Sequence, residues 1–494
     1  MATNGERLTG LDSSFLHLES QSAHMHVAAV MLLDGSPPDH AELVDMIEGR
    51  LHLVPRYRQK LAFVPLGQGR PRWVDDPHLN LNYHVRTTAL PAPGSEAQLK
   101  ALAGRVFSQK LDRDKPLWEL WVVHGLEGGE RFAVLSKTHH ALVDGISGVD
   151  IMSVLFDASA EPETPPDPGK RWLPRPLPSR TQLLAEALIE RAVVPAEIAR
   201  GVRAAFRAPR RVASAAVGAL AGVGAMAWAG INAAPSSPYN VPIGPHRRYT
   251  WVRVALSDVK AIKNAMGGTV NDVMLAIVAG GLGRDLRRRG VDTRGVELKT
   301  MVPVSIRPQE ARGALGNQVA AMMAPLPVGC EDPVARFEII STAMRKLKEG
   351  GQAVGARVMT DLTGFAPPNI MSQAARVVAR QRFFNVVVTN VPGPQHSLYL
   401  MGREMSEAFP MVPLLDRQAL GVAIMSYNGR INFGLVGDYD VMADLDQLAR
   451  DFRASLLELA EAAGVELTVS DEVRARSRNG HRPQGKVGVS AEPR

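Results

Sequence analysis

Residues 136–148 read SKTHHALVDGISG and place two adjacent histidines, an aspartate and a glycine close together in the chain. The segment RFAVLSKTHH (131–140) predicts a β-strand that ends at the histidines, and ISGVDIMSVLFD (146–157) predicts the helix that follows. A strand-to-helix turn of this kind can hold side chains rigidly toward a cleft. The stretch therefore predicts an α/β fold with a candidate site at this turn. The candidate residues in it are His139, His140, Asp144 and Gly145.

Length and composition limit the kind of protein to which this turn can belong. A chain of 494 residues, 45% of them hydrophobic, is expected to form two sizeable globular units. The single cysteine, Cys330, excludes an intramolecular disulfide framework and fits a reducing compartment. No apolar secretory segment opens the chain, so we expect a cytoplasmic protein. With 5% aromatic residues and no zinc-finger or ribonucleoprotein motif, we expect no nucleic-acid partner.

Composition divides the chain into four regions. We expect an N-terminal domain with the histidine pair, a proline-rich linker with basic and apolar helices, a C-terminal domain and a disordered tail. The second domain is predicted to contain a long helix capped by Thr269, a hairpin turning at Asn428-Gly429, and a final helix. The four regions are residues 1–160, 161–240, 241–470 and 471–494.

The linker carries a local excess of positive charge. Residues 170–211 hold ten basic and three acidic residues, a surplus that equals the formal charge of +7 of the whole chain. Arginines recur on one side of a predicted helix, opposite apolar residues, which is typical of helices that lie on anionic membranes. The solvated face of an interdomain helix remains the alternative. The arginines predicted to face the membrane are Arg200, Arg203 and Arg207.

The next segment, residues 212–231, is uncharged and as long as a bilayer span. Twelve of its twenty residues are alanine or glycine, and bulky apolar residues are sparse. We therefore favour a buried or interface-lying helix over a transmembrane one.

Three interpretations of the histidine pair compete. Adjacent residues at the end of a strand point to opposite sides, so only one histidine is expected to face a given site. A zinc site would need further ligands, and the sequence offers no HExxH helix or cysteine pair to supply them. The second interpretation is a buried structural histidine with an aspartate that caps the next helix. Because both histidines, Asp144 and Gly145 occur together at the turn, we favour catalysis and expect no metal.

Several stretches give the chain a family resemblance. HHALVDG matches the HHxxxDG motif of the CoA-dependent acyltransferase superfamily, which includes chloramphenicol acetyltransferases and condensation domains. Further stretches narrow the resemblance to the bacterial wax ester synthase/diacylglycerol acyltransferase family. They are LDSSFLHLES (11–20), KPLWEL (115–120), NDVMLA (271–276), VPVSIRP (302–308) and TNVPGP (389–394).

This resemblance implies two chloramphenicol-acetyltransferase-like α/β domains joined by a helical linker, with the active site in a channel between them. It implies His140 as the general base, with His139, Asp144 and Gly145 completing the catalytic motif, and Asn271 as an active-site donor. For Asp144 it implies a structural ion pair, for which we expect Arg307 as the partner. The residues that it places in supporting roles, together with Arg307, are Trp118, Asn317, Asn390 and Gly393.

The expected reaction moves a long-chain acyl group from acyl-CoA to diacylglycerol or a fatty alcohol, with no bound cofactor. Such acceptors lead us to expect peripheral association with the inner membrane or lipid droplets. Two alternatives are a condensation-type enzyme that takes its acyl group from a carrier protein, and a non-catalytic lipid-droplet scaffold. The sequence leaves open the acceptor, the acyl chain length and the oligomeric state.

Overall fold

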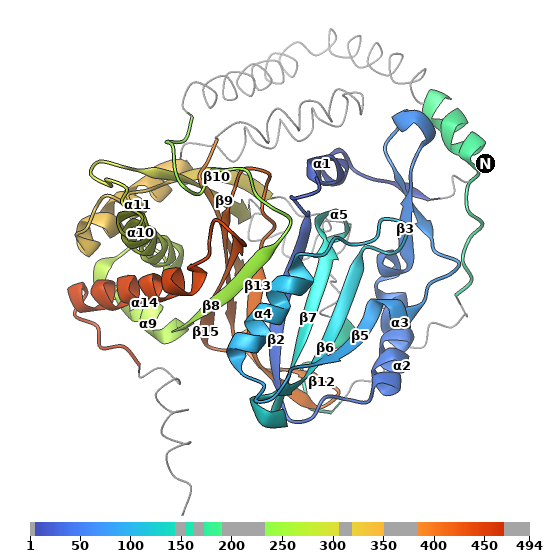
Figure 1. Ribbon diagram of the computed structural model, residues 1–494, viewed down its shortest axis with the longest axis horizontal. Coiled ribbons are helices and arrows are strands. Elements are labelled where there is room, and N and C mark those ends of the chain that lie inside the picture. The colour runs from blue at the N-terminus through green and yellow to red at the C-terminus, as the bar shows by residue number, and fades with distance from the viewer. Residues whose placement is uncertain are drawn as a thin grey trace, which may run out of the picture.

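The computed structural model describes most of the two predicted domains (Figure 1). Two six-stranded sheets form its centre, and a smaller three-stranded sheet lies at the N-terminal side. The described residues are 5–143, 154–161, 172–189, 233–305, 319–349 and 383–468. Their mixed helices and strands confirm the α/β fold class.

The first sheet has the strand order β12-β13-β2-β7-β6-β5. β7 is a central strand, paired antiparallel with β2 on one side and with β6 on the other. Its run of buried residues fits this position, since both faces of the strand are covered. The strands are β2 (His26–Asp34), β5 (Val85–Ala89), β6 (Trp118–Leu126), β7 (Arg131–His139), β12 (Leu398–Leu400) and β13 (Arg403–Met411).

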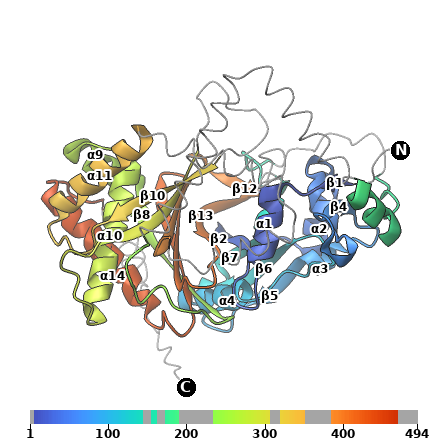
Figure 2. The same ribbon diagram turned by 90° about the horizontal axis from the view of Figure 1, so that it is seen from above.

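The second sheet has the order β10-β9-β11-β14-β15-β8. Seen from above, the helices α9, α10, α11 and α14 cover its outer face (Figure 2), and their apolar sides form one hydrophobic core with its strands. The strands are β8 (Arg247–Ala255), β9 (Leu298–Ser305), β10 (Val319–Leu326), β11 (Val386–Pro392), β14 (Leu420–Tyr427) and β15 (Arg430–Asp438). The helices are α9 (Leu256–Met266), α10 (Val270–Arg288), α11 (Pro333–Glu349) and α14 (Leu445–Ala462).

The remaining elements belong to the N-terminal half. The small sheet has the order β1-β4-β3, and residues 180–189 form a helix that lies near it in Figure 1. The strands are β1 (Glu6–Arg7), β3 (Gln59–Ala62) and β4 (Arg72–Asp75). The helices are α1 (Gly10–Leu18), α2 (His40–Arg50), α3 (Leu81–His84), α4 (Glu96–Phe107) and α5 (His140–Val143).

Two local predictions in the C-terminal half are confirmed. α10 begins after Thr269, whose side chain accepts a hydrogen bond from the Asp272 backbone, while the Asp272 carboxylate accepts one from the Thr269 backbone. This capping box satisfies N–H groups that the first helical turn leaves without partners. The hairpin of β14 and β15 turns at Asn428 and Gly429, with positive φ angles of 44° and 77°. Such angles are required by a tight hairpin turn, and asparagine and glycine adopt them readily.

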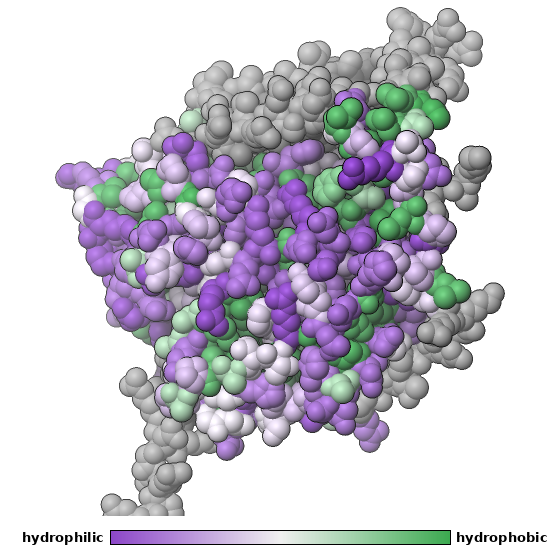
Figure 3. All heavy atoms as spheres, turned by 45° about the vertical axis from the view of Figure 1, so that its right-hand side comes forward, coloured by the Kyte–Doolittle hydropathy of each residue, from purple (hydrophilic) through white to green (hydrophobic). Residues whose placement is uncertain are grey.

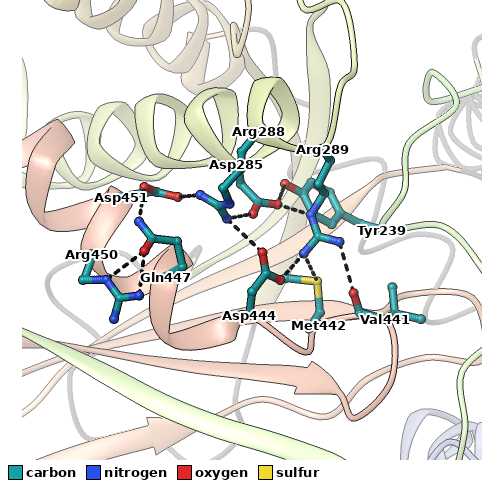
Figure 4. Close-up of polar contacts among 10 residues, drawn as sticks. All are labelled: Tyr239, Asp285, Arg288, Arg289, Val441, Met442, Asp444, Gln447, Arg450 and Asp451. Carbon is teal, nitrogen blue, oxygen red and sulfur yellow. Dashed lines mark hydrogen bonds and ion pairs between the residues drawn. The ribbon is translucent and has the colours of Figure 1, made fainter.

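A buried polar network fixes the far end of α10 (Figure 4). The fully buried Asp285 accepts hydrogen bonds from the Tyr239 hydroxyl at 2.7 Å and from the Arg289 guanidinium at 2.7 Å. Arg288 and Arg289 also bind Asp444, which precedes α14. Because a buried carboxylate is costly without such partners, the network holds α10 in one position relative to α14. It thereby fixes the direction in which Asn271, at the other end of α10, is presented.

A strand from the C-terminal half completes the first sheet. β13 pairs antiparallel with β2, from Met405 opposite Leu33 to Met411 opposite Ala28. Since β13 also packs on the second sheet, the Tyr249 hydroxyl of β8 reaches the carbonyl oxygens of Phe409 and Pro410 at 2.9 Å. Another hydrophobic core lies between the two sheets and includes residues of β13, β8 and α4.

The predicted domain ranges and the two large sheets do not coincide along the whole chain. Residues 398–411 lie within the predicted C-terminal domain, yet their strands belong to the sheet of the N-terminal half. The helix predicted at 146–157 is described only at its end, where Val154 and Leu155 are helical and buried. The predicted basic helix, the apolar segment 212–231 and the tail lie outside the described residues.

The contact between β13 and the second sheet depends on a glycine. A Cβ atom on Gly434 of β15 would lie 1.7 Å from the carbonyl oxygen of Pro410, so alanine would push the two sheets apart. We predict that Gly434→Ala lowers the free energy of unfolding by about 3 kcal/mol, as overpacking in a rigid core does. Urea denaturation would measure it. Gly49→Ala in α2 is the matched control, because nothing lies within 4 Å of that position; equal stability of both variants would contradict the prediction.

Candidate active site

The histidine pair lies where β7 gives way to α5, as the sequence predicted. The backbone N–H of His139 donates to the carbonyl of Leu117 at 2.9 Å, and that of His140 donates to the carbonyl of Met25 at 2.8 Å. The turn is thus tied to the segments that precede β6 and β2. Two backbone hydrogen bonds on successive residues leave the turn little freedom to rotate.

His139 points into the protein. Its side chain is 1% exposed, and its Nδ1 accepts a hydrogen bond from the Ala141 backbone N–H at 3.1 Å. Burial, with a smaller contribution from the Arg113 charge, lowers the pKa of His139 to about 3. The ring is therefore neutral at physiological pH, with its lone pair occupied and its proton on Nε2. These features suit a side chain that braces the turn better than one that accepts a proton.

His140 points the other way and is partly exposed. Its ring stacks on Phe15 of α1, with 3.9 Å between the ring centroids and 26° between the ring planes. The two rings thus differ in exposure and in their neighbours, His139 beside Glu19 and His140 against Phe15. Of the two rings, only that of His140 has access to solvent. The geometry is compatible with His140 as the general base, and this role remains a prediction.

Glu19 and Arg113 surround the buried histidine. A carboxylate oxygen of Glu19 lies 4.0 Å from His139 Nε2, and Arg113 Nε donates to the other oxygen of Glu19 at 2.8 Å. Arg113 also donates to the carbonyl of Leu16 in α1 at 3.0 Å. The Glu19 side chain is only 3% exposed, so its charge needs this arginine. The ion pair holds the end of α1 against the histidine turn.

Asn271 and Asn390 come together in the second half of the chain. The Asn390 side-chain N–H donates to the Asn271 side-chain oxygen at 3.3 Å. This contact turns the amide nitrogen of Asn271 away, where it can donate to another group. Asn271 is the second residue of α10, and the N-terminal end of a helix favours negative charge. The pair is therefore suited to stabilise an oxyanion, although its part in catalysis is still a prediction.

Two further predicted residues have structural surroundings. Trp118 is buried, donates to the carbonyl of Tyr57 at 2.9 Å and stacks on His84, which makes it a core residue of the first sheet. Gly393 follows β11 where the chain leaves the second sheet. A Cβ atom there would lie 2.4 Å from the Ser426 carbonyl oxygen, so the close approach of the two segments requires glycine.

The other predicted residues lie outside the described ranges. These are the aspartate and glycine of the HHxxxDG motif, the arginine expected to pair with that aspartate, one asparagine in a supporting role, and the three arginines predicted to face the membrane. They are Asp144, Gly145, Arg307, Asn317, Arg200, Arg203 and Arg207.

Phe15, Glu19 and Arg113 were missed as site residues by the sequence analysis. Phe15 and Glu19 belong to LDSSFLHLES and lie four residues apart, Phe15 within α1 and Glu19 at its C-cap. That spacing was a usable signal that both contact one neighbouring segment, which is the histidine turn. Nothing in the sequence around Arg113 identified it as the partner of Glu19.

Within the part of the chain that the structure describes, no three histidine, cysteine, aspartate or glutamate side chains converge as metal ligands. A pocket of about 310 Å³ lies at the seam between α4, β8 and α14. Its lining includes Lys100, Arg248 and Tyr439, but not His140. The predicted channel to the histidine therefore remains an expectation.

Comparison with known proteins identifies the family. Residues 8–274 match the wax ester synthase/diacylglycerol acyltransferase catalytic domain, and residues 315–460 match the WS/DGAT C-terminal domain. The chain belongs to the wax ester synthase/diacylglycerol acyltransferase family. This WS/DGAT protein is accordingly an acyltransferase, and the resemblance inferred from its motifs is confirmed.

Individual relatives agree with this assignment. A putative diacylglycerol O-acyltransferase of Mycobacterium tuberculosis is 32% identical over 472 residues, covering 93% of this chain and 91% of the relative. A probable diacylglycerol O-acyltransferase of the same species, tgs1, is 33% identical and covers 92% and 95%.

Solved structures show the same relationship. The wax ester synthase/diacylglycerol acyltransferase from Marinobacter aquaeolei VT8 superposes with a TM-score of 0.65 at 26% identity, covering 93% of this chain and all of that one. The first condensation domain of the calcium-dependent antibiotic synthetase, 14% identical with a TM-score of 0.54, shares the fold and covers 93% of this chain and 97% of its own. Both comparisons confirm the predicted two-domain fold class.

Three buried histidines around the WS/DGAT site make its stability depend on pH. Burial lowers the pKa of His24 to about 4, that of His139 to about 3, and that of His26 well below its usual value of 6.5. Each histidine is neutral in the folded protein, whereas the unfolded chain binds protons below pH 6.5. The contribution of these neutral histidines to the free energy of unfolding is therefore fully present above pH 6.5 and decreases as the pH falls toward 4. Each histidine contributes about 1.4 kcal/mol of loss per pH unit.

Urea unfolding at pH 7.5 and pH 5.5 measures this effect. We predict a drop of at least about 4 kcal/mol between the two pH values: three such contributions, to which His84, whose pKa burial also lowers, adds. His26→Gln should reduce the drop by about a third, whereas His78→Gln, at an exposed position, should leave it unchanged. A drop of the same size in His26→Gln as in the unmodified protein would contradict the assignment.

Proposed function

We propose that this WS/DGAT protein transfers a long-chain acyl group from acyl-CoA to the hydroxyl of diacylglycerol, and accepts a fatty alcohol as a second acceptor. The observation that carries the proposal is the orientation of the histidine pair. His139 is buried and neutral, while His140 is partly exposed on a turn that two backbone hydrogen bonds fix.

In the proposed reaction, His140 takes the proton of the acceptor hydroxyl while its oxygen attacks the thioester carbonyl. The new C–O bond forms, and the carbonyl oxygen becomes an oxyanion. Asn271 and the N-terminal end of α10 supply donors for that charge. When the C–S bond breaks, the imidazolium returns its proton to the CoA thiolate. No covalent acyl-enzyme is needed, so the nucleophile is the acceptor itself.

His140→Ala tests the role of the base. A positioned general base contributes about 10² to 10⁴ to the rate, so we predict a loss of kcat of that size with normal folding. The measurement uses purified protein with labelled palmitoyl-CoA and offers diacylglycerol and hexadecanol in competition. His78→Ala is the control, since His78 is exposed. Ester formation at an unchanged rate by His140→Ala would disprove the mechanism.

The same assay separates the alternative functions. Turnover with free acyl-CoA argues against a requirement for a carrier protein, and any turnover excludes a purely non-catalytic scaffold. The ratio of triacylglycerol to wax ester then gives the preferred acceptor.

We also propose that the protein works at the surface of the inner membrane or of lipid droplets. No single helix of the described ranges is long and apolar enough to cross a membrane. α9 and α10 meet that test only together, with a bend of 98° between them. Support for peripheral contact comes instead from exposed apolar side chains of the N-terminal half.

These side chains lie on two elements that touch. The loop between β3 and β4 contacts the helix 180–189, where a Cβ atom on Gly69 would lie 3.1 Å from that of Ala187. Leu66 at the loop tip is 85% exposed and has a φ of 57°, an unfavourable angle for leucine. Hydrophobic surface gathers at the upper right of Figure 3, where Figure 1 places this helix. The apolar patch comprises Phe63, Leu66, Leu188 and Ile189.

The charge around the apolar patch suits an anionic lipid surface. Arg180 is exposed at the start of the helix, Arg175 before it is exposed and paired with Asp75 at 3.2 Å, and the basic run of the sequence continues after the helix. Apolar insertion together with basic residues is the usual combination in peripheral membrane proteins. In Figure 1, the helix 180–189 and α1, which carries Phe15, both lie along the upper side of the molecule. A lipid acceptor would therefore be collected on the side of the histidine turn.

Replacing Leu66 and Ile189 together by serine tests the apolar patch. We predict about thirty-fold weaker binding to phosphatidylglycerol-containing vesicles, since each leucine or isoleucine contributes on the order of 1 kcal/mol when it is only partly inserted. Co-sedimentation measures the binding. Leu457→Ser on α14 is the matched control, because Leu457 is also exposed, at 52%, but belongs to the other half.

A second set of variants separates charge from apolar insertion. Replacing Arg200, Arg203 and Arg207 by serine should weaken binding at low salt and have little effect at high salt. Vesicle binding unchanged in both sets of variants would refute peripheral attachment through this region.

A further inference from the structure

We infer that Phe15 is a positioning residue for His140 whose ring face stabilises the imidazolium formed during acyl transfer. This inference rests on the proposed role of His140 as the general base. According to this inference, Phe15 of α1 acts together with the histidine of the HHxxxDG motif, although the two residues are far apart in sequence.

The stacking geometry carries the inference. The rings of Phe15 and His140 are 3.9 Å apart at their centroids and nearly parallel, at 26°. The face of a phenylalanine ring has a partial negative potential, so it attracts a cation placed over it. A neutral imidazole lacks the charge on which this attraction acts. Contact with Phe15 therefore favours the protonated state of His140 over the neutral one.

The protonation state of His140 changes during the reaction. The base is neutral when the acceptor arrives and cationic once it holds the hydroxyl proton. Because the attraction to Phe15 grows as the charge develops, it lowers the energy of the transition state more than that of the substrate complex. Such a differential interaction raises kcat and leaves substrate binding unchanged.

Hydrogen bonds at both ends of α1 hold the helix that carries Phe15. At its start, Thr9 accepts a hydrogen bond from the Asp12 backbone at 3.1 Å. At its end, the Arg113 guanidinium binds both Glu19 and the carbonyl of Leu16. Beyond the helix, the Ser20 hydroxyl donates to Asp416, a residue of the C-terminal half, at 2.7 Å. A ring held in this way can also fix the plane of the imidazole, which a freely rotating side chain could not do.

Glu19 and Arg113 are charged groups of the described residues that lie near the turn. Glu19 is paired with Arg113 and faces His139. His139 itself remains neutral because of its burial. Neither side chain is therefore a substitute for the ring of Phe15, which contacts His140 directly.

Stepwise fluorination of Phe15 distinguishes this role from simple packing. Fluorine withdraws electron density from the ring face while changing the ring volume little, so mono-, di- and trifluorophenylalanine at position 15 weaken the cation attraction in steps. We expect log kcat for acyl transfer to fall with each fluorine, by about five-fold in total for the trifluoro variant. KM for palmitoyl-CoA and the thermal unfolding midpoint should not change.

Two substitutions and one control complete the experiment. Phe15→Leu should lower kcat about ten-fold, whereas Phe15→Tyr should retain most of it, because tyrosine keeps an aromatic face. Trifluorophenylalanine at Phe433, a buried ring of the C-terminal core, should leave kcat unchanged. A kcat that does not change across the fluorinated series, while His140→Ala is inactive, would overturn the role of Phe15 alone. Activity retained by His140→Ala would overturn the proposed function on which it rests.

Discussion

The pairing of β13 with β2 is the interaction on which the arrangement of the two halves depends. β13 comes from the C-terminal half but provides a strand of the first sheet, and β2 in turn pairs with β7, which ends at His139. The hydrogen bonds of one sheet therefore connect the two halves, and the core between the sheets is buried by the same strand. Gly434 lets the second sheet approach this strand at backbone distance. Any shift of β13 would be transmitted through β2 to the histidine turn.

Local chemistry made part of this structure predictable. The helix cap at Thr269, the Asn428-Gly429 turn and the strand before the histidines each depend on residues close in sequence, and each was predicted correctly. Pairing of β13 with β2 depends instead on tertiary contacts, since many strands have compatible apolar patterns. The composition of consecutive segments predicts two domains. It does not predict that a strand of one domain lies in the sheet of the other.

The same distinction applies to the site. The alternation of side chains along a strand predicted that His139 and His140 would face opposite sides, and only the structure determined which one is buried. Asn271 and Asn390 were each selected from family motifs, but their hydrogen bond joins a helix start to a strand end. Phe15 was overlooked because stacking against His140 is a long-range contact, and one phenylalanine in an apolar helix resembles any other.

The charges around the buried histidine explain why two adjacent imidazoles can differ so strongly. Glu19 would favour a protonated His139, but the guanidinium of Arg113 offsets that charge, and burial then keeps the ring neutral. A neutral His139 retains the lone pair that accepts the Ala141 N–H, and this hydrogen bond shapes the first turn of α5 at His140. If His139 were protonated, the bond would be lost and the turn would relax. Keeping one histidine uncharged is therefore a condition for holding the other, the proposed base, in a fixed orientation.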